Sequence, residues 1–253
     1  MSPSVAGVGV ELAFEERGRG EPLLLIHDLA ADHLAMLPLA ERLAQAGAGR
    51  VIAYARRGYA PSGAPEPYDG TTIAEQAEDA AALLRGLGAQ GALAVGQGFG
   101  ALIALDLLLR HARLLRGAVL ADPPLLAFVP EATRLLADER GRIQEAVFAD
   151  GPRAGVAQWL GPAVQGEARE RALAHHRAFF ADYAGFATLS VTRRELRELG
   201  RPVAVVTGPA TAPHVVQAAD ALAALLPDAR RVTDGDTLGA TLALAGAPGR
   251  TPA

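Results

Sequence analysis

Short apolar runs alternate with longer segments of helical periodicity along most of the chain. Continuous apolar runs separated by helices are typical of a parallel sheet that is covered on both faces. The pattern therefore predicts an α/β fold. Buried strands are predicted at Pro22–His27, Arg50–Ala55, Ala92–Gly96, Gly117–Ala121 and Pro202–Thr207, with a half-buried strand at Val8–Glu16 and a weaker one at Arg230–Thr233.

The helices between these strands have local signals of their own. Thr72 and Glu75 form a capping-box pattern, in which each side chain bonds a free backbone N–H at the start of a helix. Apolar residues follow at helical spacing, so a helix is expected to begin there. Further helices are predicted at Leu37–Gln45, Phe99–His111 and Val215–Leu226.

One stretch interrupts the alternation of strands and helices. Residues 124–200 have helical patterns and no strand pattern. An all-helical insertion after a strand of a parallel sheet is expected to cover the carboxyl ends of the strands, where such sheets bind ligands. We therefore expect a core formed by residues 1–123 and 201–253, and a helical lid, or cap, at 124–200. Its helices are predicted at Glu131–Ala149, Gly155–Leu160 and Glu167–Ala184.

Composition narrows the chemistry. The 253 residues contain no Cys, Lys or Asn, so disulfides, thiolate nucleophiles and Schiff-base catalysis are excluded. The net charge of −4 offers no general attraction to nucleic acid or to anionic lipid. The chain has no apolar run long enough to span a membrane and no signal-peptide pattern. A cytoplasmic protein that binds neither nucleic acid nor membrane is expected.

Five segments, taken in order, resemble the α/β-hydrolase family over essentially the whole chain. The resemblance implies a mostly parallel sheet of about eight strands, with the cap inserted after the sixth. The segments are LLLIHDLAADH (strand and oxyanion loop), VIAYARRGYAPSG (the next strand and its turn), ALAVGQGFGALIAL (strand, nucleophile elbow and buried helix), RPVAVVTG and RRVTDGDTLGATL.

The residues at the family's catalytic positions depart from its pattern. The nucleophile elbow reads Gly-x-Ser-x-Gly in the family, whereas residues 96–100 read GQGFG and place Gly98 at the nucleophile position. The segment 208–212 contains no carboxylate where the acid is expected, and Asp236 follows Gly235 where the His is expected. Because the serine mechanism needs all three groups, the sequence predicts that the Ser-His-Asp triad is missing.

The family's oxyanion hole consists of two backbone N–H groups, and these persist whatever side chains surround them. By position, the donors are Leu29 and Phe99. Such a pair stabilises an enolate or a polarised carbonyl as well as a tetrahedral intermediate. We therefore expect noncovalent chemistry on the scaffold of a hydrolase.

Candidate catalytic groups are then the carboxylates and imidazoles near this site. Asp28, which replaces the usual Gly after His27, is a candidate general base; in the alternative interpretation, it is a loop carboxylate that bonds nearby N–H groups. Asp122 and Asp236 are either remnants of the triad or residues of polar turns. Candidate catalytic residues are Asp28, Asp236, His175, His176 and Asp122, and candidate substrate-binding residues are His27, Leu29, Gln97, Gly98, Phe99, Trp159, Phe180 and Tyr183.

Three functions remain open. The first is a lyase, isomerase, cyclase or C–C bond-forming enzyme that acts noncovalently on an apolar, carbonyl-bearing small molecule, for example in biosynthesis. The second is a protein that binds or sequesters a small molecule without turnover, and the third is a hydrolase that activates water directly. No cofactor and no metal are expected, because the adjacent His175 and His176 point in different directions and no carboxylate cluster joins them. A homodimer is a further possible assembly of the chain.

Overall fold

The computed structural model describes residues 2–246, and an eight-stranded sheet forms its centre. The order across the sheet is β1-β2-β4-β3-β5-β6-β7-β8, with β1 and β2 antiparallel to their neighbours and the remaining pairs parallel. The predicted mostly parallel α/β fold is therefore confirmed. The strands are β1 (Ser4–Ala6), β2 (Glu11–Arg17), β3 (Pro22–Ile26), β4 (Arg50–Tyr54), β5 (Ala92–Gln97), β6 (Leu115–Ala121), β7 (Val203–Val206) and β8 (Ala229–Val232).

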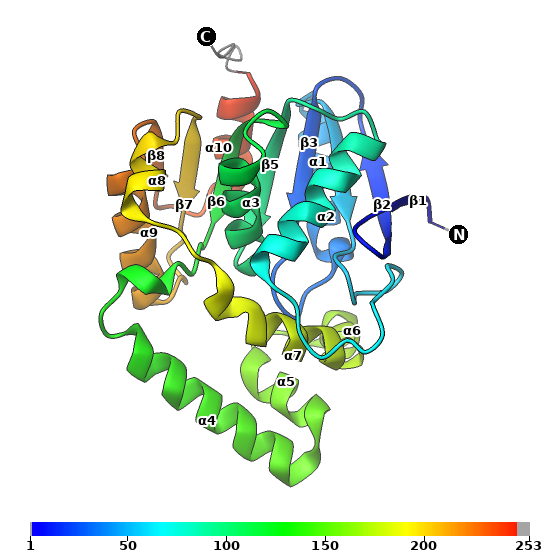
Figure 1. Cartoon of the computed structure of the whole chain (residues 1–253), viewed down its shortest axis with the longest axis vertical. Helices are drawn as coiled ribbons and strands as arrows, with labels where there is room; N and C mark the ends of the chain where they lie inside the picture. Colours follow the sequence, from blue (N-terminus) through cyan, green and yellow to red (C-terminus); the bar gives the residue numbers. More distant parts are fainter. Residues whose placement is uncertain (1, 247–253) are drawn as a thin grey trace.

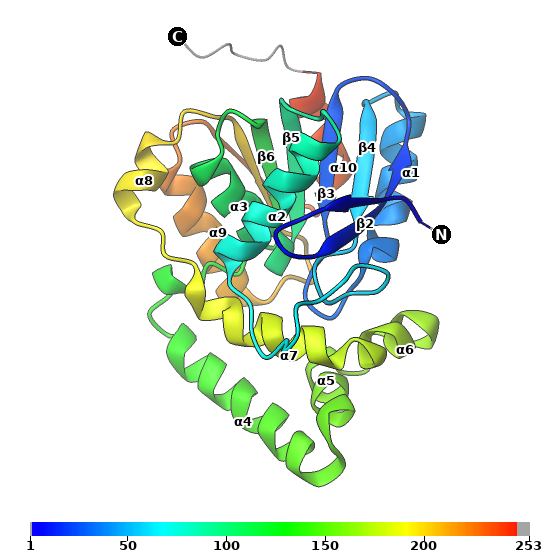
Figure 2. The same cartoon turned by 45° about the vertical axis from the view of Figure 1, so that its right-hand side comes forward.

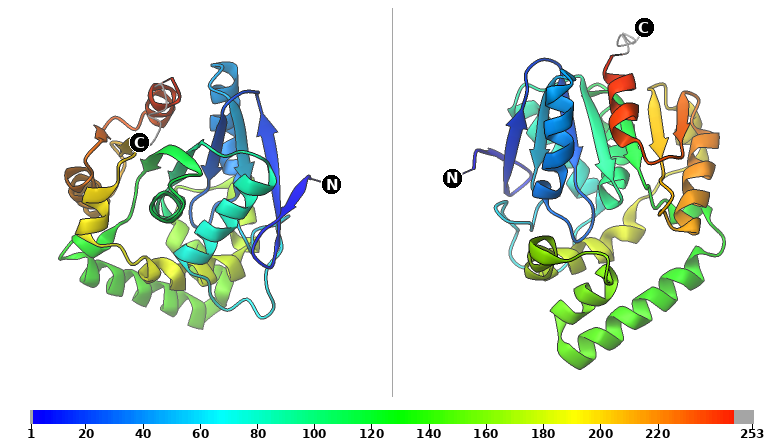
Figure 3. Two further views of the ribbon diagram at one scale, coloured as in Figure 1. Left: turned by 45° about the horizontal axis from the view of Figure 1, so that its top comes forward. Right: turned by 180° about the vertical axis from the view of Figure 1, so that it is seen from behind.

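Helices cover both faces of this sheet (Figures 1 and 3). Helices α1 and α10 pack on one face, and α2 and α3 pack on the other, each over its own cluster of buried apolar side chains. A sheet covered in this way requires strands that are apolar on both faces, as the sequence pattern indicated. The core helices are α1 (Leu37–Gln45), α2 (Ile73–Gly86), α3 (Phe99–Arg110), α9 (Pro213–Leu225) and α10 (Thr237–Ala245), with a 3-10 turn η1 (His33–Met36) before α1.

The segment between β6 and β7 is helical, and its first helices lie beyond the carboxyl ends of the strands (Figures 1 and 2). We call helices α4 to α7 the cap. That residues 124–200 form a separate cap domain stays a prediction. Helix α8, which lies within this range, packs against α9 of the core. The helices are α4 (Ala132–Asp150), α5 (Pro152–Leu160), α6 (Gly166–Ala174), α7 (His176–Gly185) and α8 (Arg193–Glu198), with 3-10 turns η2 (Leu126–Phe128) and η3 (Phe186–Thr188).

Several elements differ from the sequence prediction, among them α8, which was not predicted. The strand expected at Val8–Glu16 begins only at Glu11, as β2, because residues 8–10 belong to a turn in which the N–H of Gly7 donates to the carbonyl of Val10. This turn joins β2 to the unpredicted strand β1. The helix expected at Glu167–Ala184 is divided into α6 and α7 at His175, whose ψ of 24° leaves the helical region. Within residues 2–246, no helix is long and apolar enough to cross a membrane.

Candidate functional site

The turn between β5 and α3 places Gly98 at the carboxyl edge of the sheet. Its φ of 53° and ψ of −118° are accessible to glycine but strained for residues with a side chain. The N–H of Gly98 donates to the carbonyl of Ala121 on the adjacent strand, which fixes the turn against β6. The backbone therefore has the sharp strand-to-helix bend of a nucleophile elbow, but it presents no side chain.

The carboxylate of Asp28 occupies the space that a side chain at position 98 would need. A Cβ atom built on Gly98 would lie 2.0 Å from Oδ1, 2.1 Å from Cγ and 2.3 Å from Oδ2 of Asp28. Distances this short are incompatible with any side chain at position 98 while Asp28 keeps its position. The carboxylate of Asp28, from the loop after β3, therefore occupies the volume that a side chain at position 98, after β5, would fill.

The two expected oxyanion-hole donors converge on Asp28. Its Oδ1 accepts the N–H of Leu29 at 2.6 Å and the N–H of Phe99 at 2.7 Å. The expectation that these donors are free for a substrate oxygen therefore does not hold in this structure, because the protein's own carboxylate fills them. Oδ2 of Asp28 forms no hydrogen bond with the described residues.

This environment shifts the ionisation of Asp28. Burial raises its pKa from the ordinary value of 3.8 to about 6, because the cavity solvates the charged form poorly. The N–H groups of Phe99 and Leu29 and the charge of Arg56 act against this shift, whereas the charge of Asp122 adds to it. A carboxyl group with a pKa of about 6 is ionised at neutral pH and is a stronger base than an ordinary aspartate.

The side chain of His27 forms a hydrogen bond with the backbone of Asp28. Its Nε2 accepts the backbone N–H of Arg56 at 3.1 Å, so Nδ1 bears the proton and donates to the carbonyl of Asp28 at 2.9 Å. Burial keeps the pKa of His27 well below its ordinary value, so the ring is neutral. His27 is fully buried and does not reach the cavity. It positions the backbone of Asp28 and is not placed to contact a substrate.

A cavity of about 1640 Å³ lies between the Gly98 turn and the cap. Asp28, Leu29, Gln97, Gly98 and Asp122 line the end at the sheet, which we call the floor. The structure therefore brings most of the residues predicted on the core to one cavity. Aromatic side chains line the cap side, namely Trp159 of α5, Phe180 and Tyr183 of α7, and Phe186 of η3.

The cap aromatics pack around one buried ring. Phe179 is fully buried, stacks with Tyr183 at a ring separation of 5.7 Å and meets Trp159 edge-on at 5.5 Å. Phe179 and Tyr183, four residues apart on α7, therefore share one face of this helix. Phe99 was predicted to act through its backbone N–H, and its ring packs against Phe186 at 5.2 Å. Only its backbone N–H contacts the candidate site.

Neither cap histidine lines the cavity. His175 faces the loop after β4, where its Nε2 accepts the N–H of Ala60 and its ring lies 5.3 Å from that of Tyr59. His176 bonds the carbonyl of Leu173 through Nδ1. His175 lies at the break between α6 and α7, and His176 is the first residue of α7. A direct catalytic role for either imidazole therefore has no support from its placement.

Asp122 follows β6 and lies between two cavities. Its φ of 48° is uncommon for a residue with a side chain, although Asp tolerates the left-handed region. Oδ1 of Asp122 accepts the hydroxyl of Thr211, which also accepts the N–H of Gly208. Thr211 thus stands in the loop after β7 where the family resemblance implies an acid. Asp122 lines both the large cavity and a smaller one.

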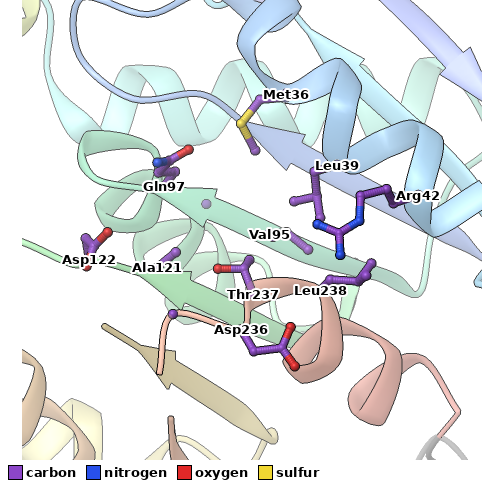
Figure 4. Close-up of a pocket in the computed structure, with 12 residues that line it drawn as sticks. Met36, Leu39, Arg42, Val95, Gln97, Ala121, Asp122, Asp236, Thr237 and Leu238 are labelled. Carbon is purple, nitrogen blue, oxygen red and sulfur yellow. The ribbon is translucent and has the colours of Figure 1, made fainter. Parts of the chain in front are cut away.

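The smaller cavity, of about 270 Å³, lies between α1, the carboxyl ends of β5 and β6, and the start of α10 (Figure 4). Asp236 lines it but does not line the large cavity. The carboxylate of Asp236 caps α10 by accepting the N–H of Gly239. Gln97 and Asp122 are shared by the two cavities. Asp28 and Asp236, both predicted as catalytic residues, therefore lie in different cavities.

Sequence reasoning missed several charged or titratable residues near the floor. His214, near the start of α9, is the histidine that lines the large cavity within the described chain. Arg56 and Asp182 form a fully buried ion pair directly behind the site. The pair was missed because Arg56 and Asp182 are far apart in sequence and no motif connects them. For His214, the position after Pro213 at a helix start was a weak available signal. The described residues contain no group of three or more potential metal ligands.

Comparison with known families identifies the fold. The model of the alpha/beta hydrolase family matches residues 23–242, so the chain belongs to this family. No curated protein sequence matches the chain.

Many solved structures resemble the chain at low sequence identity. A hydrolase from Pseudomonas aeruginosa is 22% identical and has a TM-score of 0.77, covering 97% of this chain and 98% of that one. A thermophilic esterase from Thermogutta terrifontis is 24% identical, with a TM-score of 0.75 and coverages of 96% and 93%. An enol-lactonase from Burkholderia xenovorans is also 24% identical, with a TM-score of 0.66 and coverages of 91% and 90%. At these identities, the likeness establishes the fold alone.

Proposed function

We propose that this member of the alpha/beta hydrolase family is a cofactor-independent enzyme that transfers a proton within an apolar small molecule. Asp28 is its general base, and no covalent intermediate forms. The observation that carries the proposal is the Asp28 carboxylate on the cavity floor. Its Oδ1 is held by two backbone N–H groups, and its Oδ2 has no hydrogen-bond partner among the described residues.

The composition of the cavity supports a mechanism without a nucleophilic serine. The chain has four serines, at positions 2, 4, 62 and 190, and none of them lines the large cavity. The hydroxyl of Ser62 donates to the carbonyl of Ala55 and accepts the N–H of Ala13, so it supports the turn after β4. We propose on these grounds that the triad is missing and that this scaffold does not carry acyl-enzyme chemistry.

The proposed reaction begins at a carbon next to a carbonyl group. Oδ2 of Asp28 takes the proton from that carbon, and the C–H electrons move toward the carbonyl oxygen. Return of the proton to another carbon completes an isomerisation, so no other reactant is consumed. The side-chain amide of Gln97, which bonds none of the described residues, is the donor on the floor that meets the developing oxyanion.

The surroundings favour this chemistry. Aromatic and aliphatic side chains dominate the cap side of the cavity, which suits an apolar substrate. Exclusion of water raises the pKa of Asp28 to about 6 and so strengthens it as a base. Because the base must be ionised, the rate is expected to rise with pH through about 6 and then to level off.

Hydrolysis by a water molecule that Asp28 activates is the second candidate. Solved structures of the same fold include two named as esterases and one named as an enol-lactonase, which favours a hydrolytic reaction on a related substrate. Asp28 and Asp122 both line the floor and so could hold such a water between them. Against this candidate, the N–H groups of Leu29 and Phe99 are bonded to Asp28 and cannot stabilise a tetrahedral intermediate.

We further propose that the partner is a small molecule, that neither nucleic acid nor membrane takes part, and that the protein acts in the cytoplasm. The net charge of −4 agrees with the first part of this proposal. Whether the chain forms a homodimer is measured directly by light scattering.

Deuterium exchange tests the proposed function. A panel of apolar ketones and lactones is incubated with the protein in deuterated buffer, and α-proton exchange is followed by NMR. The wild-type protein is expected to accelerate exchange in at least one compound, and Asp28→Asn is expected to abolish this acceleration while binding persists. Asp138→Asn, which removes an exposed carboxylate of α4 outside the cavity lining, is the matched control.

The alternatives give different results in parallel assays. Ester or lactone hydrolysis that is lost in Asp28→Asn, without labelling by a serine-directed phosphonate, replaces proton transfer with water activation. Labelling of any serine together with hydrolysis overturns both candidates. Tight binding with neither exchange nor hydrolysis shows a binding protein and overturns the catalytic proposal.

A further inference from the structure

A cluster of charged and polar side chains lies behind the candidate site, outside both cavities. We call it the Asp182 cluster, and it consists of Arg56, Tyr59, Gln76 and Asp182. Arg56 and Asp182 form an ion pair with an Nη1–Oδ2 distance of 2.7 Å, and their side chains are 1% and 0% exposed. The Tyr59 hydroxyl donates to Oδ2 of Asp182 at 2.8 Å. The Gln76 amide donates to Oδ1 at 2.6 Å.

The cluster joins the cap to the core. Asp182 belongs to α7, Gln76 to α2, and Arg56 and Tyr59 to the loop after β4. The Nη1 group of Arg56 also donates to Oε1 of Gln76 at 2.5 Å. An ion pair without water requires that both charges are fully bonded, since an unpaired buried charge is strongly destabilising. Both oxygens of Asp182 are bonded, whereas Nε of Arg56 has no hydrogen-bond partner among the described residues. The contacts of Asp182 fix α7 to the core at this point.

Arg56 connects the cluster to the general base. Its Nη2 donates to the backbone carbonyl of Asp28 at 3.1 Å, and its backbone N–H donates to His27, which donates to the same carbonyl. The guanidinium also lies 5.0 Å from the ring centre of Phe99, whose N–H holds Oδ1 of Asp28. Arg56 thus contacts both Asp182 and Asp28, the residue that we propose to be the base.

We propose that Asp182 is a positioning residue for Asp28, which acts by holding Arg56 against the Asp28 backbone and by neutralising its charge. This inference rests on the proposed function of Asp28. It implies that the side chain of Asp182 both holds α7 against the core and influences the pKa of Asp28.

The charges around Asp28 define the expected effect. Arg56 from the loop after β4 stabilises the carboxylate, and Asp122 at the end of β6 opposes it, while His27 of the β3 end is neutral. Glu139, Arg140, Arg171 and His214 line the same cavity from the cap and from α9. Asp182 pairs with Arg56, so its negative charge opposes part of the effect that the positive charge of Arg56 has on Asp28. Removal of the Asp182 charge ends this opposition and is expected to lower the pKa of Asp28.

The experiment measures the titration of Asp28 in the full chain without any substrate. The carboxyl carbon of aspartate is labelled with ¹³C, and the Asp28 signal is assigned by its loss in Asp28→Asn. In Asp182→Asn, the pKa of Asp28 is expected to fall by about one unit, as is typical when a nearby charge changes. An unchanged pKa overturns the proposal.

Two control variants separate positioning from general damage. Asp79 forms a comparable buried pair with Arg57, in which Nε lies 2.6 Å from Oδ2, but it does not contact Asp28 or Arg56. Asp79→Asn is expected to lower stability while the Asp28 titration stays in place. Tyr59→Phe removes one hydrogen bond to Asp182 but no charge, and its titration of Asp28 is also expected to match wild type. A shift in Asp79→Asn equal to that in Asp182→Asn contradicts the proposal.

A double variant covers the case in which Asp182→Asn does not fold. Replacing both partners, in Arg56→Met with Asp182→Asn, leaves no unpaired buried charge and is expected to fold. Because it removes the cation, it is expected to raise the pKa of Asp28, the opposite of the single variant. An unchanged value there overturns the proposal. Because no turnover is measured, these results stand apart from the exchange assay, and either proposal can fail alone.

Discussion

At the level of single residues, positions 28 and 98 form one structural unit. The strained turn at residue 98 is kept although no side chain projects from it, and the carboxylate of Asp28 fills the vacated volume. The two backbone N–H groups that would meet a substrate oxygen instead hold Oδ1 of Asp28. Asp28 and Gly98, which both depart from the family pattern and follow different strands, are therefore sterically dependent on each other.

Restoring a serine at the turn tests this dependence. Gly98→Ser is expected to lower the free energy of unfolding by about 2–5 kcal/mol, because overlap with Asp28 adds to strain at a positive φ. Combining it with Asp28→Gly removes the overlap and is expected to recover most of the loss. Urea denaturation of the three variants provides the measurement. A Gly98→Ser variant as stable as wild type would show that Asp28 moves away without cost.

At the level of elements, local signals predicted most helices and strands well. The helix at Leu37–Gln45 was predicted with its observed bounds, and the capping box of Thr72 and Glu75 has both of its hydrogen bonds. These signals succeed because each depends on residues within one turn. The break at His175 could not be predicted in this way, because a contact with the loop after β4 competes with helix continuity there.

The same distinction applies to the candidate site. Asp28, Gln97 and the cap aromatics were found because they fall in motifs or at regular spacing. The orientation of His175 and His176, neither of which lines the cavity, was not predictable, since it depends on where α6 ends. The pairing of Arg56 with Asp182 joins a core loop to a cap helix, and only tertiary packing determines it.

The packing of the cap predicts a large effect at Phe179. This ring is fully buried among Trp159, Phe180 and Tyr183, so Phe179→Ala is expected to cost about 3–5 kcal/mol through the cavity it leaves. The matched control is Phe148→Ala on α4, where the ring is 90% exposed and the expected change is within about 0.5 kcal/mol. Fluorescence of Trp159, the single tryptophan, reports unfolding of the cap directly. Equal effects at the two positions would contradict this packing.

At the level of the whole molecule, the candidate site lowers stability. Asp28 is harder to ionise in the folded protein than in the unfolded chain, because its folded pKa is raised to about 6. Below its ordinary value of 3.8, both states are protonated and the group has no cost. As pH rises from there through about 6, the unfolded chain loses its proton first, and the folded state becomes relatively less stable.

Asp28→Asn is therefore expected to be more stable than wild type at neutral pH. The difference is expected to be near zero at about pH 3, to grow up to about pH 6 and to level off at up to about 3 kcal/mol, which is the free energy of the pKa shift. Urea denaturation of both proteins across this pH range measures it. Wild type and Asp28→Asn have all other titrating groups in common. A difference in unfolding free energy that is the same at every pH would therefore show that ionisation of Asp28 does not cause it.

The Asp28 carboxylate at the Gly98 turn also restricts how this chain can change during evolution. The present placement of the carboxylate requires a glycine at position 98, because no Cβ fits beside it. A later mutation that restores serine alone now meets a steric block. A side chain at position 98 is thus compatible with this fold only once the Asp28 carboxylate has been replaced or displaced, so the order in which these two positions change matters.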